Sequence, residues 1–295
     1  MVISKQLKND KDEQIGEESP KADFLPLNFR EVMSRRTEEP MANNAITRRM
    51  KNEVDNGKGG IALEAGVVLK MQGICMTFPG VKALEGVDLT LKKGEIRALM
   101  GENGAGKSTL IKCLTGVNKF EAGEIYLEGF DHPIVNKDTM DAQKKGISTV
   151  YQEVNLCPNL SVAENLYIGR EPLTKLGTVN RKAMNRQAAA LMKQLELDVD
   201  VTRNLEEYSL ALQQMIAIAR AVDMDCKVLI LDEPTSSLDD REVEKLFTMM
   251  RRLKEKGVGI IFVTHFLEQV YAVCDGITVL RNGQLVGEYE IADLP

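Results

Sequence analysis

The chain has 295 residues, of which 43% are hydrophobic, which is enough for one large domain or two small ones. No apolar run approaches the length of a membrane span, and the start of the chain lacks the pattern of a secretory signal. The net charge of −6 argues against non-specific binding of nucleic acid but leaves a localised basic patch open, and the absence of tryptophan with an aromatic content of 5% leaves few side chains for stacking on bases. The five scattered cysteines argue against a cysteine-bound metal or a disulfide framework.

Residues 1–66 differ in composition from the rest of the chain. They mix acidic and basic side chains densely, as in Lys8–Glu13, and carry few apolar residues. A segment that cannot bury a core stays disordered. We therefore expect a disordered charged leader here, which is either a dispensable tail or an arm that binds a partner.

From residue 67 the patterning is that of a folded domain, which we expect to extend to residue 291. Short apolar runs separated by glycine or charged turns predict a first group of strands. These strands are Leu69–Phe78, Val87–Leu91, Ile96–Leu99 and Glu124–Leu127. The segment Lys92–Glu95 has the composition of a hairpin turn. After Gln152 the pattern becomes helical to about Val222, and Ser161 with Glu164 predicts a capping box at the start of one helix.

The last part of the chain alternates between strands and helices. The predicted elements are strand Lys227–Leu231, helix Arg241–Lys256, strand Val258–Val263, helix Phe266–Val273 and strand Ile277–Arg281. Asn282 and Gly283 then turn a hairpin into a final strand. This alternation predicts an α/β domain with a parallel sheet.

The most specific motif is the phosphate loop, residues 101–109, which reads Gly-Glu-Asn-Gly-Ala-Gly-Lys-Ser-Thr between an apolar strand and a helix. Its glycines bring backbone N–H groups close to phosphate oxygens, its lysine supplies a cation, and its serine supplies a hydroxyl ligand for Mg²⁺. These residues are Gly101, Gly104, Gly106, Lys107 and Ser108. The sequence therefore predicts a nucleoside triphosphate site.

Three apolar strands downstream of this loop end in polar residues. One strand ends in two adjacent acids, of which Asp232 would hold Mg²⁺ and Glu233 would polarise the attacking water. The alternative for these acids is a helix N-terminus that favours negative charge. Gln152 ends a second strand, where it can reach the metal or its water, and His265 ends a third. Because ligands sit at strand ends in α/β sheets, we expect these residues to share one site with the loop.

In their order, these motifs resemble those of the ATP-binding subunits of ABC transporters across residues 67–291. The resemblance implies a P-loop NTPase of ABC ATPase type, an α/β fold with a parallel core sheet, an antiparallel β subdomain and an inserted helical subdomain at about residues 155–225. It implies ATP and Mg²⁺ as ligands. The residues it assigns to catalysis are Glu233, His265, Lys107 and Gln152; those to nucleotide binding are Phe78, Gly101, Asn103, Gly104, Gly106, Lys107, Ser108, Thr109, Ser209 and Asp239; and those to the metal are Ser108, Gln152 and Asp232. For Phe78, a core aromatic at a strand end is the alternative.

Other segments resemble the monosaccharide importers of the ribose, xylose and galactofuranose type. They are Phe78–Leu84, Gly101–Gly104 and Ser161–Glu171, while Tyr208–Gln214 and Thr264–Tyr271 lean towards the galactofuranose branch. The resemblance implies a subunit that hydrolyses ATP to energise sugar import, peripheral to the cytoplasmic face of the membrane. The implied partners are a second nucleotide-binding domain, membrane permease subunits and, indirectly, a sugar-binding protein, without nucleic acid. The alternatives are a non-transport ABC ATPase and a truncated half-domain that binds ATP without hydrolysing it.

The chain departs from that family in two respects. The family signature Leu-Ser-Gly-Gly-Gln is replaced by the segment Tyr208–Leu212, in which Ser209 survives but Leu210 and Ala211 replace the glycines. Larger side chains there hinder close approach to a γ-phosphate, so we expect two unequal sites in the assembled pair of domains. The chain also lacks a second phosphate loop, from which we expect either a truncated product or a second half in a separate chain.

Overall fold

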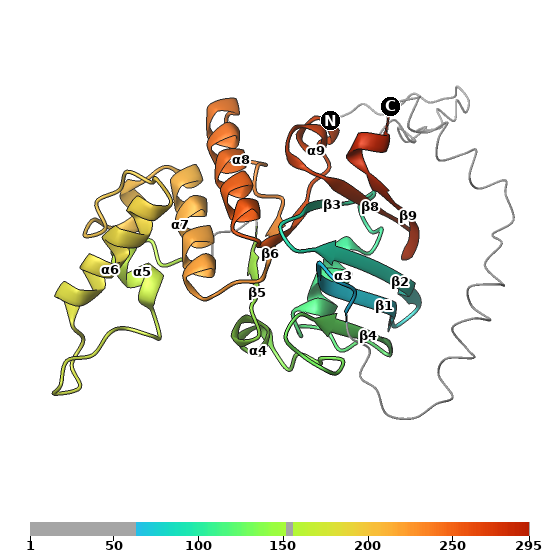
Figure 1. Cartoon of the computed structure of the whole chain (residues 1–295), viewed down its shortest axis with the longest axis horizontal. Helices are drawn as coiled ribbons and strands as arrows, with labels where there is room; N and C mark the ends of the chain where they lie inside the picture. The colour runs from blue at the N-terminus through green and yellow to red at the C-terminus, as the bar shows by residue number, and fades with distance from the viewer. Residues whose placement is uncertain (1–62, 152–155, 295) are drawn as a thin grey trace, which may run out of the picture. The chain divides into compact units, whose positions relative to one another are not determined.

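The computed structural model describes residues 63–151 and 156–294, which are drawn in colour in Figure 1. The predicted leader lies outside the described residues apart from residues 63–66, and Gln152 also lies outside them. All five cysteines are described and are free thiols. Among the described helices, none combines the length and apolar character that crossing a membrane requires.

Three strands form an antiparallel sheet, in the order β2-β1-β4. They are β1 (Val67–Phe78), β2 (Val81–Lys92) and β4 (Ala122–Leu127). Strand β1 pairs antiparallel with both neighbours. On β2 the alternate residues Val87, Leu89 and Leu91 are buried, because one face of the sheet packs on the core. This sheet is the predicted antiparallel β subdomain.

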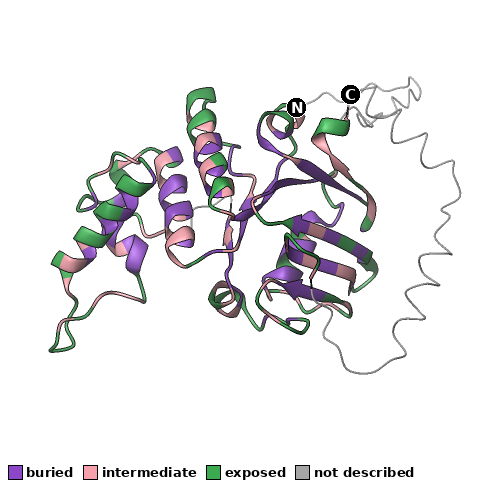
Figure 2. Ribbon diagram, viewed as in Figure 1, coloured by how far each residue is buried: buried purple, intermediate pink, exposed green. Residues whose placement is uncertain are grey.

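A second sheet of six strands forms the core, in the order β5-β6-β7-β3-β8-β9. Its strands are β3 (Ile96–Met100), β5 (Ile147–Val150), β6 (Val228–Asp232), β7 (Gly259–Val263), β8 (Gly276–Arg281) and β9 (Gln284–Glu290). All neighbours pair in parallel except β9, which is antiparallel to β8 at one edge. Every residue of β3 and β7 is buried, as expected for central strands (Figure 2). The predicted parallel core is therefore correct, with an antiparallel strand added at its edge.

The prediction of a hairpin at residues 92–95 is wrong. A turn does form at Lys93 and Gly94, but β2 pairs with β1 in one sheet, whereas β3 pairs with β7 and β8 in the other. The turn carries the chain from one sheet to the next. Gly94 is needed there because its φ is +64° and an added Cβ would come within 2.8 Å of the Lys254 carbonyl oxygen. Composition identifies the turn but not the partner of each strand.

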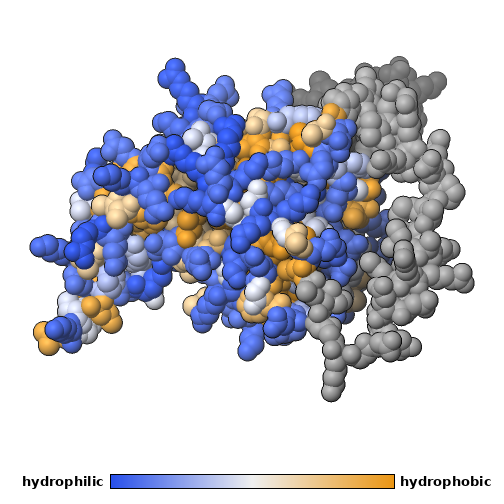
Figure 3. Space-filling view, in the orientation of Figure 1, coloured by the Kyte–Doolittle hydropathy of each residue, from blue (hydrophilic) through white to orange (hydrophobic). Residues whose placement is uncertain are grey.

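Helices cover the core sheet and extend beyond it (Figure 1). Those of the core are α3 (Lys107–Leu114), α4 (Thr139–Lys144), α8 (Asp240–Glu255), α9 (Leu267–Val273) and the short η2 (Ile291–Asp293). Between β5 and β6 the chain forms α5 (Val162–Tyr167), α6 (Arg181–Gln194), η1 (Leu205–Glu207) and α7 (Leu210–Asp223). The capping box predicted for α5 is present, with the Glu164 amide donating to Ser161 Oγ over 3.2 Å. Apolar side chains are exposed at the loop between α5 and α6 (Figure 3), where Leu176 is 91% exposed.

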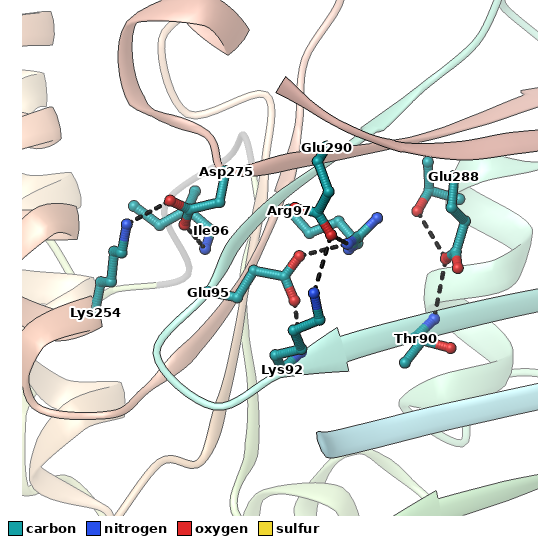
Figure 4. Close-up of polar contacts among 10 residues, drawn as sticks. Thr90, Lys92, Glu95, Ile96, Arg97, Lys254, Asp275, Glu288 and Glu290 are labelled. Carbon is teal, nitrogen blue, oxygen red and sulfur yellow. Dashed lines mark hydrogen bonds and ion pairs between the residues drawn. The ribbon is translucent and has the colours of Figure 1, made fainter. Parts of the chain in front are cut away.

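A polar cluster fastens the edge strand β9 to β3 and to the end of β2 (Figure 4). Arg97 Nη2 lies 2.6 Å from Glu95 Oε1 and 3.5 Å from Glu290 Oε1, and Lys92 Nζ lies 2.9 Å from the same Glu290 oxygen. The side chains of Arg97 and Glu95 are each only 5% exposed. Gly276 leaves room for the guanidinium, since an added Cβ would come within 2.7 Å of Arg97 Nη2. The cluster therefore places a buried ion pair, Arg97 with Glu95, at the start of β3, and the partly exposed Glu290 of β9 lies beside it.

Candidate functional site

A cavity of about 400 Å³ lies at the ends of β6 and β7 and at the start of α3. We call it the loop cavity, because most of the phosphate loop lines it. The predicted site residues that it brings together are Asn103, Gly104, Gly106, Lys107, Ser108, Thr109, Asp232 and Glu233. The two motifs that the sequence placed far apart, the loop and the pair of acids, thus form one site.

The shape of the loop depends on glycines at two crowded positions. A Cβ at Gly101, where φ is +152°, would lie 2.4 Å from the Leu280 carbonyl oxygen. A Cβ at Gly106, where φ is +104°, would lie 2.8 Å from the Ala83 carbonyl oxygen and 2.9 Å from Leu84 Cδ2. The loop is therefore held between the end of β8 and the start of β2, and glycine is required for the close approach.

Lys107 supplies the cation of the site. It is 8% exposed, and its Nζ donates to the carbonyl oxygens of Gly101 over 2.7 Å and Glu102 over 3.1 Å. Burial lowers the pKa of Lys107, while the nearby charges of Glu233 and Asp232 oppose that shift. Within the described part of the chain, no carboxylate forms an ion pair with this ammonium group. Its charge is therefore available to an anion in the cavity.

Asp232 ends β6, Glu233 follows it, and both acids line the cavity. The Glu233 amide donates to the Val263 carbonyl oxygen over 3.0 Å, and the φ of Glu233 is +48°, in the left-handed region that side chains other than glycine adopt rarely. Burial raises the pKa of Asp232, and so does the Glu233 charge beside it, while Lys107 and Lys112 lower it. The two carboxylates thus lie beside the phosphate loop, and carboxylate and phosphate oxygens are the ligands that Mg²⁺ prefers.

His265 lies beside Glu233, because β6 and β7 pair in parallel and end at the same edge of the sheet. Its Nδ1 is 3.6 Å from Glu233 Oε1, and its ring centroid is 4.0 Å from that of Phe266. Gln152 lies outside the described residues. The strand that precedes Gln152 in the chain is β5, and the pairing of Val150 with Leu231 places the end of β5 next to the end of β6.

Four predicted contacts of the nucleotide lie outside the lining of the loop cavity: Phe78, Gly101, Ser209 and Asp239. Phe78 is the last residue of β1, is 39% exposed, and pairs across the turn with Val81, which does line the cavity. Ser209 caps α7, where its Oγ accepts from the Leu212 amide over 3.4 Å. Asp239 caps α8, where Oδ1 accepts from the Glu242 amide over 2.8 Å. The roles of Phe78, Gly101, Ser209 and Asp239 in binding nucleotide therefore stay predictions.

The sequence interpretation missed part of the cavity wall. The additional lining residues are Val81, Lys82, Ala83, Ala105, Val263 and Asn282. Two turns bring most of them there: the Gly283 amide donates to the Ala105 carbonyl oxygen over 3.0 Å, and the Glu85 amide donates to the Gly283 carbonyl oxygen over 2.8 Å. Asn282 and Gly283 carried a clear turn signal, but nothing in their sequence shows that the turn packs on the loop.

A second cavity, of about 200 Å³, lies between α4, β5 and α7. Its lining includes Ser148, Thr149 and Arg220, and it contains none of the predicted site residues that the structure describes. The loop cavity is therefore the candidate site.

The residues present in the loop cavity fit a nucleoside triphosphate with Mg²⁺. At Gly104 an added Cβ meets nothing within 4 Å, so the backbone is open to a ligand. Among the residues that the structure describes, no group of three or more acidic, histidine or cysteine side chains is arranged to hold a metal ion by itself. Mg²⁺ suits such a site, because it is commonly held by one or two carboxylates together with substrate phosphates and water.

Comparison with known proteins identifies relatives that are similar in sequence. Residues 84–236 match the family model described as ABC transporter. The galactofuranose transporter ATP-binding protein YtfR of Escherichia coli (strain K12) is 57% identical over 228 residues, which are 77% of this chain and 45% of that protein. The fructose import ATP-binding protein FruK of Bifidobacterium longum is 52% identical over 229 residues, which are 77% of this chain and 44% of that protein. The chain thus spans less than half the length of these curated relatives.

Comparison with solved structures supports the same fold. The dimeric, post-hydrolysis state of an ATP-binding cassette bound to ADP and Pi matches with a TM-score of 0.63 and 26% sequence identity, covering 76% of this chain and 98% of that chain. The predicted α/β fold of P-loop type, with its antiparallel β subdomain, is therefore confirmed.

Proposed function

Because the chain belongs to the ABC transporter family, which its match over residues 84–236 shows, we propose that it binds and hydrolyses ATP to energise the import of a monosaccharide. The observation that carries this proposal is the loop cavity, where the phosphate loop and Lys107 face Asp232 and Glu233. The similarity to the galactofuranose and fructose proteins supports a sugar as the transported molecule.

The phosphates of ATP would lie against the loop. Backbone N–H groups of residues 101–109 and the ammonium group of Lys107 bind the phosphate oxygens, and the N-terminal end of α3 adds its positive dipole. Ser108, Gln152 and Asp232 would hold Mg²⁺, which neutralises phosphate charge during the transfer. Positioning and charge neutralisation carry most of the catalysis in reactions of this type.

The attacking water would lie beside Glu233, whose carboxylate orients it and accepts its proton. His265, whose Nδ1 is 3.6 Å from Glu233 Oε1, would steady the γ-phosphate. The left-handed backbone of Glu233 turns its carboxylate towards the cavity at the strand end, where backbone strain is tolerated for function.

The proposed assembly contains further chains. We take residues 67–291 as the nucleotide-binding domain, with residues 155–225 as its helical subdomain. Ser209 and Asp239 lie outside the lining of the loop cavity, which supports a role for them at the site of a second nucleotide-binding domain. Membrane permease subunits and, indirectly, a sugar-binding protein complete the proposed complex, with this chain peripheral to the cytoplasmic face of the membrane.

The replacement of Glu233 by glutamine tests the chemistry. Glu233→Gln should bind a fluorescent ATP analogue as the wild type does but lose phosphate release, measured for the chain alone and with its permease subunits. Glu244→Gln is the matched control, because Glu244 is exposed on α8 and pairs with Arg251. Unchanged phosphate release in Glu233→Gln would reject the assigned role.

The altered signature segment favours a second candidate, a half-domain that binds ATP without hydrolysing it. Wild-type protein that binds the analogue but releases no phosphate, alone or with permease subunits, would support that candidate. If the two sites are unequal, Ser209→Ala should reduce turnover of the assembled transporter less than Glu233→Gln does. Equal losses in these two variants would contradict the asymmetry.

A further inference from the structure

One side chain on α9 joins the two strand ends that carry Glu233 and His265. Gln269 Oε1 accepts a hydrogen bond from Thr235 Oγ1 over 2.8 Å and another from Thr264 Oγ1 over 3.3 Å. Thr235 follows Glu233 by two residues, and Thr264 immediately precedes His265. Both threonines are buried, with exposed fractions of 5% and 1%. A single carboxamide oxygen therefore links the chain after β6 to the chain after β7.

Thr264 also holds Phe266, the residue that follows His265 in the chain. Thr264 Oγ1 accepts from the Phe266 amide over 3.1 Å, and the Phe266 ring lies against the imidazole at 4.0 Å between centroids. His265 itself is exposed, so little packing holds its ring in place. The position of the imidazole therefore depends on the backbone on both sides of it, which Thr264 and Gln269 hold.

We propose that Gln269 is a positioning residue, which acts through Thr235 and Thr264 to hold the Glu233 carboxylate and the His265 imidazole beside each other. Gln269 is not among the residues that line the loop cavity, so it has no direct contact with the substrate there. The proposal rests on the proposed function for the roles of Glu233 and His265. Displacement of a catalytic group by about 1 Å can cost on the order of a hundredfold in rate, which makes such a link consequential.

The kinetic test compares three variants. Gln269→Leu removes the acceptor at similar size, Gln269→Glu keeps an oxygen acceptor in the same place, and Gln187→Leu repeats the first change on the exposed face of α6. We expect Gln269→Leu to lower kcat by about ten- to a hundredfold, with the KM for ATP within about twofold of wild type. Gln269→Glu should recover most of the rate, and Gln187→Leu should match the wild type.

A second measurement does not depend on turnover. The chain has only two histidines, His132 and His265, so their imidazole signals can be resolved by NMR. In Gln269→Leu the His265 signals should move, because the ring shifts relative to Phe266 and Glu233, while the His132 signals stay in place. In Gln269→Glu both sets should stay near their wild-type positions.

The two measurements separate the failure of this proposal from the failure of the proposed function. If wild-type protein shows no hydrolysis, the NMR comparison still decides whether Gln269 positions His265. Unmoved His265 signals in Gln269→Leu overturn the proposal. A loss of rate that Gln269→Glu does not recover, or a rise in KM without a fall in kcat, overturns it as well. Thermal unfolding of each variant verifies that the folded protein is being compared.

Discussion

Replacing Arg97 with methionine is expected to destabilise the protein strongly and in a pH-dependent manner. Arg97 is the partner of the buried Glu95 carboxylate, at 2.6 Å, and both side chains are 5% exposed. Methionine fills much of the volume but removes the positive charge. Glu95 then remains buried with its hydrogen bond from the Lys92 amide and without a cation beside it.

The magnitude follows from the cost of an unpaired buried charge. Removal of one partner of a buried ion pair costs about 3–5 kcal/mol, whereas an exposed pair contributes about 0–1 kcal/mol. The matched control is Arg251→Met, because Arg251 pairs with Glu244 at 2.9 Å on the surface, with side chains 44% and 64% exposed. The difference in unfolding free energy between Arg97→Met and Arg251→Met therefore measures the effect of burial on the cost of removing the arginine.

The dependence on pH has a definite sign. Burial raises the pKa of Glu95 above its ordinary value of 4.5, while Arg97 and the Lys92 amide lower it. A carboxyl group whose pKa is raised in the folded state binds more protons there than in the unfolded state, so its contribution to stability falls as the pH rises from 4.5 through the folded pKa. Loss of Arg97 raises that pKa further, so the deficit of Arg97→Met relative to wild type should shrink by up to about 1.4 kcal/mol for each pH unit of acidification between the folded pKa of Glu95 in the variant and its lower folded pKa in the wild type.

Urea unfolding at pH 8 and pH 5.5 measures both effects. We expect Arg97→Met to lower the free energy of unfolding by about 3–5 kcal/mol at pH 8 and by less at pH 5.5. Arg251→Met should stay near the wild-type value at both pH values. The double variant Glu95→Gln with Arg97→Met should recover part of the loss, because it removes the buried charge altogether. A deficit below about 1 kcal/mol at pH 8, or one that does not change with pH, would refute the reasoning.

Three further changes test the site and its supports. Gly101→Ala should lower the thermal unfolding temperature and abolish binding of a fluorescent ATP analogue, since its Cβ would meet the Leu280 carbonyl oxygen at 2.4 Å; wild-type binding would contradict the geometry. Lys107→Ala should weaken analogue binding about ten- to a hundredfold by titration, as expected for loss of a charged hydrogen bond; a change below threefold would show that the ammonium group is dispensable. Asp239→Ala should cost about 0.5–2 kcal/mol in urea unfolding, because it removes the capping box of α8; unchanged stability would mean that the cap contributes nothing.

The sequence predicted the helices and strands better than it predicted which strands pair with one another. The strand 228–232 and the helix 240–255 lie within one residue of their predicted ends, since an uninterrupted apolar run and a helical period mark them. The pairing of β2 and β3 was predicted wrongly, because Lys93 and Gly94 encode a turn but not the sheet that each strand joins. That choice depends on contacts with β1 and β7, which are distant in the sequence.

The same limit applies to the candidate site. The loop and the acids were predicted because their residue types match the chemistry of phosphate and Mg²⁺. Lys82 and Asn282 were missed, since they reach the cavity only through the packing of two turns on the loop. Gln269 was missed for a related reason: one glutamine within a helix carries no signal until the fold brings Thr235 and Thr264 to it.

The left-handed backbone at Glu233 lowers the stability of the folded protein at a position that the proposed activity requires. Residues other than glycine in this region cost roughly 1–2 kcal/mol, so the folded protein gives up stability to keep a carboxylate at the strand end. Glycine at this position would relieve the strain and remove the carboxylate in the same step. A redesign that optimised folding alone would therefore discard Glu233 early, and thermal stability is a misleading guide to the quality of any variant altered at this residue.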